Sequence, residues 1–173
     1  SEKINELDLL LNYKPASTFI SFKNAIEILS SGTFPELLVV EYLPGEEFSV
    51  DCLANHGASV LIVPRLRKKM INGISVEGEI VEEKNIINYC RQIIKELQLH
   101  GNIGIQVKKA DSDEFLILEI NPRVQGTIAA ALGAGINFPV LAVKQEIGLR
   151  ISADELKVKW GTKFSRHWSE VFY

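Results

Sequence analysis

The stretch Leu118-Glu119-Ile120-Asn121-Pro122-Arg123 carries most of the information about the fold and the function of this chain. Successive side chains of a β-strand point to opposite faces, so Glu119 and Asn121 are predicted on one face. Leu118 and Ile120 are predicted on the other face, toward the core. The strand is therefore expected to present a carboxylate and an amide together.

A second strand, at residues 103–107, precedes this stretch, and a polar turn around Ser112-Asp113 joins the two. With the turn centred there, antiparallel pairing places Gln106 opposite Glu119 and on the same face. The carboxylate of Glu119 and the amide oxygens of Gln106 and Asn121 then converge at one end of a hairpin. Hard oxygen ligands of this kind suit Mg²⁺, so the hairpin is a candidate metal site.

Arg123 directly follows the strand. A guanidinium group binds phosphate or acyl-phosphate oxygens through paired hydrogen bonds, which makes Arg123 the candidate catalytic residue. The alternative is that Arg123 forms a surface ion pair with Glu119 and that Asn121 caps a turn. A short motif by itself leaves both interpretations open.

A second informative segment lies nearer the start of the chain. Residues 37–42 are predicted as a buried strand that runs into a Pro44-Gly45 turn of type II. The backbone of residues 41–43 would offer a carbonyl and an amide to a planar base, and Glu47 or Glu46 would accept hydrogen bonds from ribose hydroxyls. The alternative is an ordinary hairpin with solvated glutamates.

The remaining pattern combines hairpins with helices. Helices are expected over 25–29, 84–99 and 138–147, and strands over 48–53, 58–63, 103–107 and 115–120, with Asn55-His56-Gly57 as a hairpin turn. This order does not alternate as in a Rossmann domain. It predicts an α+β fold with a largely antiparallel sheet.

Composition limits the function classes. The 173 residues are 46% hydrophobic and 24% charged, as in an ordinary globular protein. The net charge of -3 gives no reason to expect nucleic acid or an anionic membrane as a partner. Cys52 and Cys90 are too few for a disulfide framework, so a cytoplasmic location is expected. The uncharged run at 124–143 is long enough for a membrane span, but its glycines favour a loop that leads into a buried helix.

Taken together, these segments resemble the ATP-grasp superfamily, specifically the carboxyl-terminal lobe of its nucleotide-binding module. Residues 41–51 look like the adenine hinge and the strand after it, and residues 105–107 with 118–123 look like the metal-binding hairpin. Gln106, in place of an acid, is similar to the large subunit of carbamoyl phosphate synthase and its relatives. The likeness spans about residues 39–148 and implies a lobe at residues 1–150, followed by an aromatic tail at 151–173.

The resemblance also implies a set of ligands and site residues. ATP would lie between two lobes, with Mg²⁺ (or Mn²⁺) against its phosphates. The implied contacts are Glu41, Tyr42 and Leu43 for adenine, Glu47 for ribose, Gln106, Glu119 and Asn121 for the metal, and Arg123 for the reacting phosphate. Arg65 and Arg67 lie where the family often places residues that face phosphate or substrate; a solvated basic strand end is the alternative for both.

Members of this family activate a carboxylate or bicarbonate as an acyl phosphate, which an amine or another nucleophile then attacks. The resemblance therefore implies an ATP-dependent ligase whose partners are a small carboxylate and an amine or ammonia. The family also needs a preceding lobe with a glycine-rich loop, and this chain has no glycine before Gly32. We therefore expect a lobe that lacks its amino-terminal half and is inactive alone. The alternative is a non-catalytic module that retains the fold.

Overall fold

The computed structural model describes residues 7, 21–33, 36, 38, 40–71, 73–167 and 169–173. The chain divides into two compact units. One comprises Leu43–Met70 with Ile74–Tyr173, and the other comprises Ser1–Tyr42 with Ile71–Gly73. The expectations for residues 4–11 and for Lys14-Pro15 lie outside the described residues, apart from Leu7.

Helix α2 (Phe22–Leu29) belongs to the second of these units. The hydroxyl of Ser21 accepts a hydrogen bond from the backbone N–H of Asn24 at 3.2 Å, which satisfies a donor at the start of the helix. The predicted helix before Gly32 is therefore confirmed.

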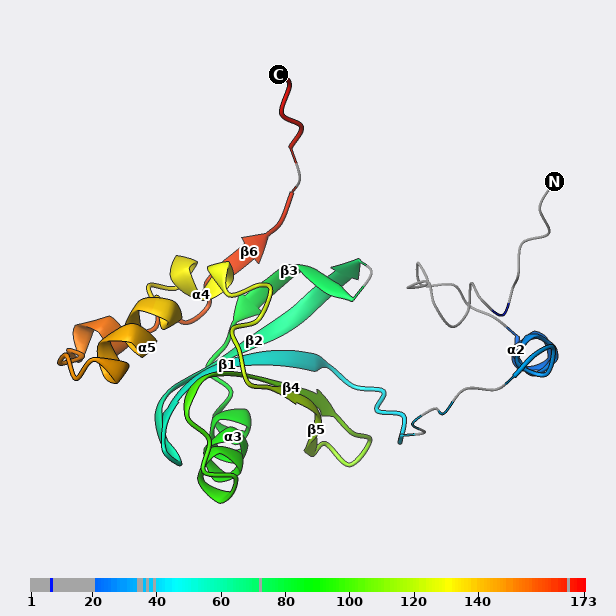
Figure 1. Cartoon of the computed structure of the whole chain (residues 1–173), viewed down its shortest axis with the longest axis horizontal. Helices are drawn as coiled ribbons and strands as arrows, with labels where there is room; N and C mark the ends of the chain where they lie inside the picture. The colour runs from blue at the N-terminus through cyan, green and yellow to red at the C-terminus, as the bar shows by residue number, and fades with distance from the viewer. Residues whose placement is uncertain are drawn as a thin grey trace. The chain divides into compact units, whose positions relative to one another are not determined.

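The larger unit is built on a six-stranded sheet with the order β5-β4-β1-β2-β3-β6 (Figure 1). Its strands are β1 (Glu47–Asn55), β2 (Ala58–Ile71), β3 (Ile74–Ile80), β4 (Gly101–Lys109), β5 (Phe115–Asn121) and β6 (Lys163–Ser165). The pairs β1–β2, β1–β4, β4–β5 and β3–β6 are antiparallel. The predicted α+β fold with a largely antiparallel sheet is confirmed.

Helix α3 (Lys84–Glu96) covers one face of the sheet (Figure 1). Its buried side chains recur at helical spacing: Ile86, Cys90, Ile93 and Ile94. They pack against the side chains of β1 and β4 that point to this face, among them Val50 and Ile105. Apolar burial against the sheet therefore holds α3 in place.

The short helix α4 (Ala129–Gly133) and α5 (Phe138–Glu146) lie over the other face of the sheet (Figure 1). Asn137 caps α5 by accepting a hydrogen bond from the Val140 N–H at 3.2 Å. The uncharged run at 124–143 therefore forms a loop and two short helices. Within the described residues, no helix has the length and apolar character needed to cross a bilayer.

The β1–β2 hairpin agrees with the sequence at its turn and differs at its far end. His56 and Gly57 both have positive φ, 46° and 84°, as a two-residue turn between twisted strands requires. β2 was expected to end at Val63, but it continues through Pro64 to Ile71. The carbonyl of Pro64 accepts a hydrogen bond from Val81 at 3.0 Å, so the strand remains paired beyond the proline.

The strand predicted at residues 37–42 is wrong for the residues that are described. Leu38, Val40 and Tyr42 are exposed and lie in no strand. An apolar run becomes a strand only where a neighbouring strand completes its backbone hydrogen bonds, and no ladder reaches these described residues.

The type II turn at Pro44-Gly45 is also wrong, because Gly45 lacks the positive φ that this turn requires. The glycine is needed for a close approach instead. Its N–H donates to the carbonyl of Lys109 at 3.0 Å. A Cβ atom on Gly45 would lie 2.6 Å from that oxygen.

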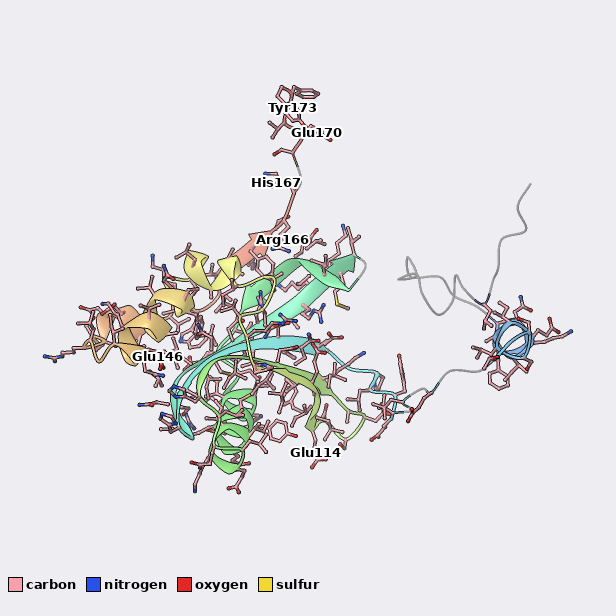
Figure 2. All side chains as sticks on the ribbon, viewed as in Figure 1. Glu114, Glu146, Arg166, His167, Glu170 and Tyr173 are labelled. Carbon is pink, nitrogen blue, oxygen red and sulfur yellow. The ribbon has the colours of Figure 1, made fainter. Side chains whose placement is uncertain are left out.

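The segment expected to form an aromatic tail contributes partly to the sheet. β6 pairs with β3, and Phe164 packs against the core on the face covered by α4 and α5. Beyond β6, Phe172 and Tyr173 are exposed and the chain extends away from the sheet (Figure 2). Trp168 lies outside the described residues.

Candidate active site

The β4–β5 hairpin places Gln106 directly opposite Glu119, as predicted, with the help of a β-bulge. Near the turn, Val107 pairs with Ile117, and the register shifts by one residue before Gln106. Leu118 is the extra residue and is 43% exposed, so its predicted place in the core is wrong. Without the bulge, Glu119 would lose its place opposite Gln106.

Gln106, Glu119 and Asn121 gather on the face of the sheet opposite α3. Oε1 of Glu119 accepts hydrogen bonds from Nε2 of Gln106 and, at 2.7 Å, from Nδ2 of Asn121. Glu119 remains exposed. The structure thus brings the three predicted metal ligands together around one carboxylate oxygen.

Polar contacts extend from this cluster in both directions. Nη2 of Arg123 lies 3.4 Å from Oδ1 of Asn121. On the other side, Nη1 of Arg67 donates to Oε1 of Gln106 at 3.2 Å and also binds Oε1 of Glu47. The predicted ribose, metal and phosphate residues therefore form a continuous series of contacts across β1, β2, β4 and β5.

Arg65 lies in the same row of the sheet but is not accessible to a ligand. Pairing across the strands aligns Arg65 with Ser49, Gln106 and Glu119. Its side chain is fully buried. Nη1 donates to the carbonyl of Thr127 at 2.5 Å, and Nη2 lies 3.4 Å from Oδ2 of Asp51.

The buried pair of Asp51 and Arg65 shows what burial does to charge. Burial raises the pKa of Asp51 from 3.8 to about 6, although Arg65 lowers it. Burial also lowers the pKa of Arg65, against the opposite effect of Asp51. Both pKa shifts favour the neutral form, so desolvation outweighs the attraction within the pair.

This pKa shift predicts how stability depends on pH. Folded Asp51 holds its proton more tightly than the unfolded chain does, so its stabilising contribution is complete below pH 3.8 and is lost as the pH rises through about 6. The free energy of unfolding of the wild type, minus that of Asp51→Asn, should fall by about 3 kcal/mol over this range. Urea titrations at a series of pH values measure it. A difference that is independent of pH would contradict the prediction.

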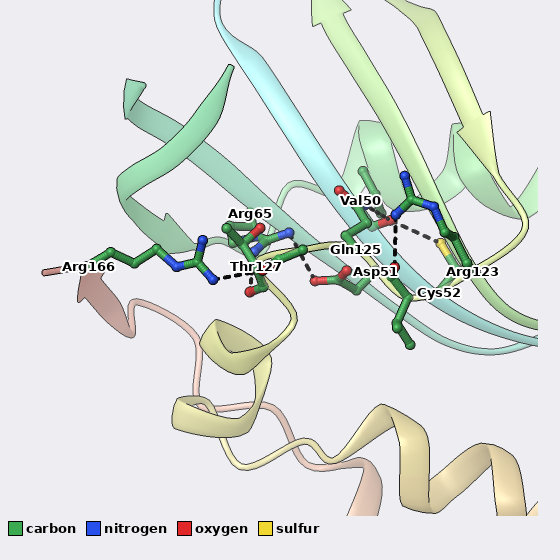
Figure 3. A network of polar contacts seen from close by, with 10 residues as sticks. Val50, Asp51, Cys52, Arg65, Arg123, Gln125, Thr127 and Arg166 are labelled. Carbon is green, nitrogen blue, oxygen red and sulfur yellow. Dashed lines mark hydrogen bonds and ion pairs between the residues drawn. The ribbon is translucent and has the colours of Figure 1, made fainter. Parts of the chain in front are cut away.

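The loop after β5, residues 122–128, passes over the buried pair (Figure 3). Nε2 of Gln125 donates to the carbonyl of Val50 at 3.0 Å, and Gln125 is 6% exposed. A Cβ atom on Gly104 would lie 2.4 Å from Cγ of Gln125. The absence of a side chain at Gly104 therefore makes room for Gln125 on the sheet.

The predicted adenine residues differ in their exposure to solvent. Glu41 and Tyr42 are exposed, whereas Leu43 is 6% exposed. Glu47 is half-buried at the start of β1 and is bound by Arg67. The contacts of residues 41–43 with adenine and of Glu47 with ribose stay predictions.

The side chains of the β4–β5 hairpin suit a hard divalent cation in their chemistry. Glu119 supplies a carboxylate, and Gln106 and Asn121 each supply an amide oxygen. Rotation of an amide about its last side-chain bond exchanges its NH₂ for its oxygen, so both amides can turn an acceptor toward a cation. Within the described residues, no group of three His, Cys, Asp or Glu side chains is placed to bind a metal ion.

Comparison with known proteins gives the family. Residues 33–169 match the family described as "ATP-grasp in the biosynthetic pathway with Ter operon". The chain belongs to the ATP-grasp family. The arginine-specific large chain of carbamoyl phosphate synthase from Halalkalibacterium halodurans is 30% identical over 128 residues, which are 68% of this chain and 11% of that protein. The large chain from Thermoanaerobacter sp. is 28% identical over 171 residues, 92% of this chain and 15% of that protein.

Solved structures agree with this ATP-grasp assignment at the level of the fold. Biotin carboxylase from Campylobacter jejuni matches with a TM-score of 0.53 and 16% sequence identity, over 68% of this chain and 29% of that chain. In sequence, the chain matches 11% and 15% of the length of the two carbamoyl phosphate synthase chains named above. It resembles a lobe of these larger ATP-grasp proteins.

Sequence reasoning missed three residues around the β4–β5 hairpin and its candidate metal ligands: Asp51, Gln125 and Arg166. Arg166 donates from Nη2 to the carbonyl of Gly126 at 2.7 Å, although 40 residues separate them. For Gln125 the sequence did contain a signal: Gly104 lies inside the apolar strand at 103–107, and a glycine within a strand marks a close approach by another segment. No local sequence pattern predicts the hydrogen bond from Arg166 to the carbonyl of Gly126.

Proposed function

We propose that this chain is the ATP- and magnesium-binding lobe of a ligase similar to carbamoyl phosphate synthase. The observation that carries the proposal is the convergence of Gln106, Glu119 and Asn121 on one face of the β4–β5 hairpin. Membership of the ATP-grasp family and the curated relatives support it. Adenine would contact residues 41–43, and ribose would contact Glu47.

In this proposal the protein positions charged groups and does not itself form a bond to the substrate. A carboxylate or bicarbonate oxygen attacks the γ-phosphorus of ATP, the bond from phosphorus to the ADP oxygen breaks, and ADP leaves. An amine nitrogen then attacks the acyl carbon, the bond from that carbon to the phosphate oxygen breaks, and phosphate leaves while the nitrogen loses a proton. A bound Mg²⁺ would neutralise charge on the phosphates.

Individual residues of this chain would have separate roles in these reaction steps. Glu119, Gln106 and Asn121 would hold the metal, and Arg123 would bind an oxygen of the transferred phosphate. Arg67, which contacts both Glu47 and Gln106, would keep the ribose and metal contacts in a fixed relation. Arg65 is fully buried, so we assign it no contact with the nucleotide.

Metal-dependent nucleotide binding tests the proposal. ATP is titrated into the chain in the presence of Mn²⁺ and, separately, in EDTA, and binding in both conditions is followed by isothermal titration calorimetry. We expect weak binding that requires the metal. Binding of equal strength in EDTA, or no binding at all, would contradict the proposal and favour a non-catalytic module.

A further inference from the structure

Side-chain hydrogen bonds attach the loop at residues 122–128 to the rest of this unit (Figure 3). Arg65 donates to the carbonyl of Thr127 at 2.5 Å, and Arg166 donates to the carbonyl of Gly126 at 2.7 Å. Gln125, within the loop, donates to Val50 in β1. Two consecutive carbonyls of the loop are therefore each bound by a guanidinium from a distant part of the chain.

The burial of Arg65 is costly, and this cost points to a role. A buried ion pair is often no more stabilising than apolar side chains of similar size. Asp51 and Arg65 are 2% and 0% exposed, and Oδ2 of Asp51 and Nε and Nη2 of Arg65 make no hydrogen bond within the described residues. The hydrogen bond of Arg65 to Thr127 is its specific contact with the loop.

Arg166 reaches the loop independently of that pair. It follows β6, and its own N–H donates to the carbonyl of Val76 at 2.7 Å, which fixes its backbone to β3. Its side chain is exposed, so no burial requirement explains its contact with Gly126. The loop is thus bound from two places, by Arg65 in β2 and by Arg166 in the segment after β6.

The same loop carries Arg123, next to the candidate metal ligands. Nη2 of Arg123 lies 3.4 Å from Oδ1 of Asn121, and the N–H of Arg123 donates to the carbonyl of Asn121 at 2.8 Å. Orientation of this guanidinium therefore depends on the path of the loop after Asn121. An error of about 1 Å in such a group is enough to weaken its contact with a reacting phosphate.

We propose that Arg65 and Arg166 are positioning residues that clamp the loop at residues 122–128 and thereby hold Arg123 in place for an anionic ligand. Asp51 serves the clamp by supplying a counter-charge to Arg65 inside the protein. The role of Arg123 rests on the proposed function, whereas the clamp itself does not.

Hydrogen exchange tests the clamp without any ligand. The N–H groups of Ile128 and Ala130 donate to the carbonyls of Gln125 and Thr127 at 3.1 and 3.0 Å, and both report on the loop. Arg166→Ala should accelerate exchange at both amides by at least about tenfold without changing the urea midpoint. The exposed Arg150→Ala is the matched control and should change neither. Unchanged exchange in Arg166→Ala would overturn the proposal.

Nucleotide affinity tests whether the clamp positions Arg123. Mn·ATP binding should be about three- to tenfold weaker in Arg166→Ala and in the double variant Asp51→Leu/Arg65→Met, and Arg166→Lys should recover part of the loss. Wild-type affinity in both variants, despite faster loop exchange, would overturn the positioning role. If the wild type itself does not bind Mn·ATP, the proposed function fails, and the exchange experiment alone decides on the clamp.

Discussion

Replacing Arg65 with methionine is expected to lower the free energy of unfolding by about 3–5 kcal/mol at neutral pH, because it leaves a buried carboxylate without a counter-charge. Asp51 is 2% exposed and lies in the centre of the sheet, so water cannot replace the lost guanidinium. The carbonyl of Thr127 loses its donor as well. Urea unfolding of the single variant measures this loss.

The double variant Asp51→Leu/Arg65→Met should recover most of that loss. Removing both charges eliminates the desolvation cost, and two apolar side chains of similar volume fill the space. The pKa of Asp51 is already raised to about 6 beside Arg65, and removing Arg65 should raise it further. The destabilisation by Arg65→Met alone should therefore be larger at pH 8 than at pH 5.

Two outcomes would contradict this account of the pair. If the double variant were no more stable than Arg65→Met, the loss would come from packing or from the Thr127 contact and not from the unpaired charge. If Arg65→Met changed stability by less than about 1 kcal/mol, the pair would behave like an exposed one. The exposed pair of Lys23 and Glu27 in α2 is the control, and Lys23→Met should have little effect.

The sequence predicted the elements in which local pattern and tertiary environment agree. α3 and α5 have apolar residues at helical spacing or a capping side chain at the start, and both formed close to where they were expected. The turn at His56-Gly57 requires positive φ, which its residues adopt. In these cases the information lies within a few neighbouring residues.

Prediction failed where distant segments decide the environment. Asp51 alternates with Val50 and Cys52, as in a strand with one wet face, yet the loop at residues 122–128 and the helices after it cover that face. Arg65 was expected near a ligand and is buried for the same reason. The opposition of Gln106 and Glu119 was predicted, but it depends on a bulge at Leu118 that no local pattern indicates.

Glu119→Gln is expected to weaken Mn·ATP binding about 100-fold. Loss of a residue that merely supports a metal ligand costs 10–100-fold in affinity, so loss of the single carboxylate of the set should cost at least as much. Glutamine keeps the size and an acceptor oxygen, so Gln106 and Asn121 can still donate to it. Because Glu119 is exposed, stability should change by less than about 1 kcal/mol.

Water-proton relaxation with Mn²⁺ and ³¹P line broadening of ATP measure the loss against a matched control. Glu114→Gln removes the same charge from an exposed glutamate in the β4–β5 turn (Figure 2), so it reproduces the change in net charge but not the loss of the ligand. Equal weakening in both variants would mean that long-range electrostatics and not coordination attracts the metal. Unchanged binding in Glu119→Gln would mean that Glu119 is not a metal ligand. The two neighbouring amides are too weak as ligands to hold Mn²⁺ alone, so the proposed metal site would then be wrong.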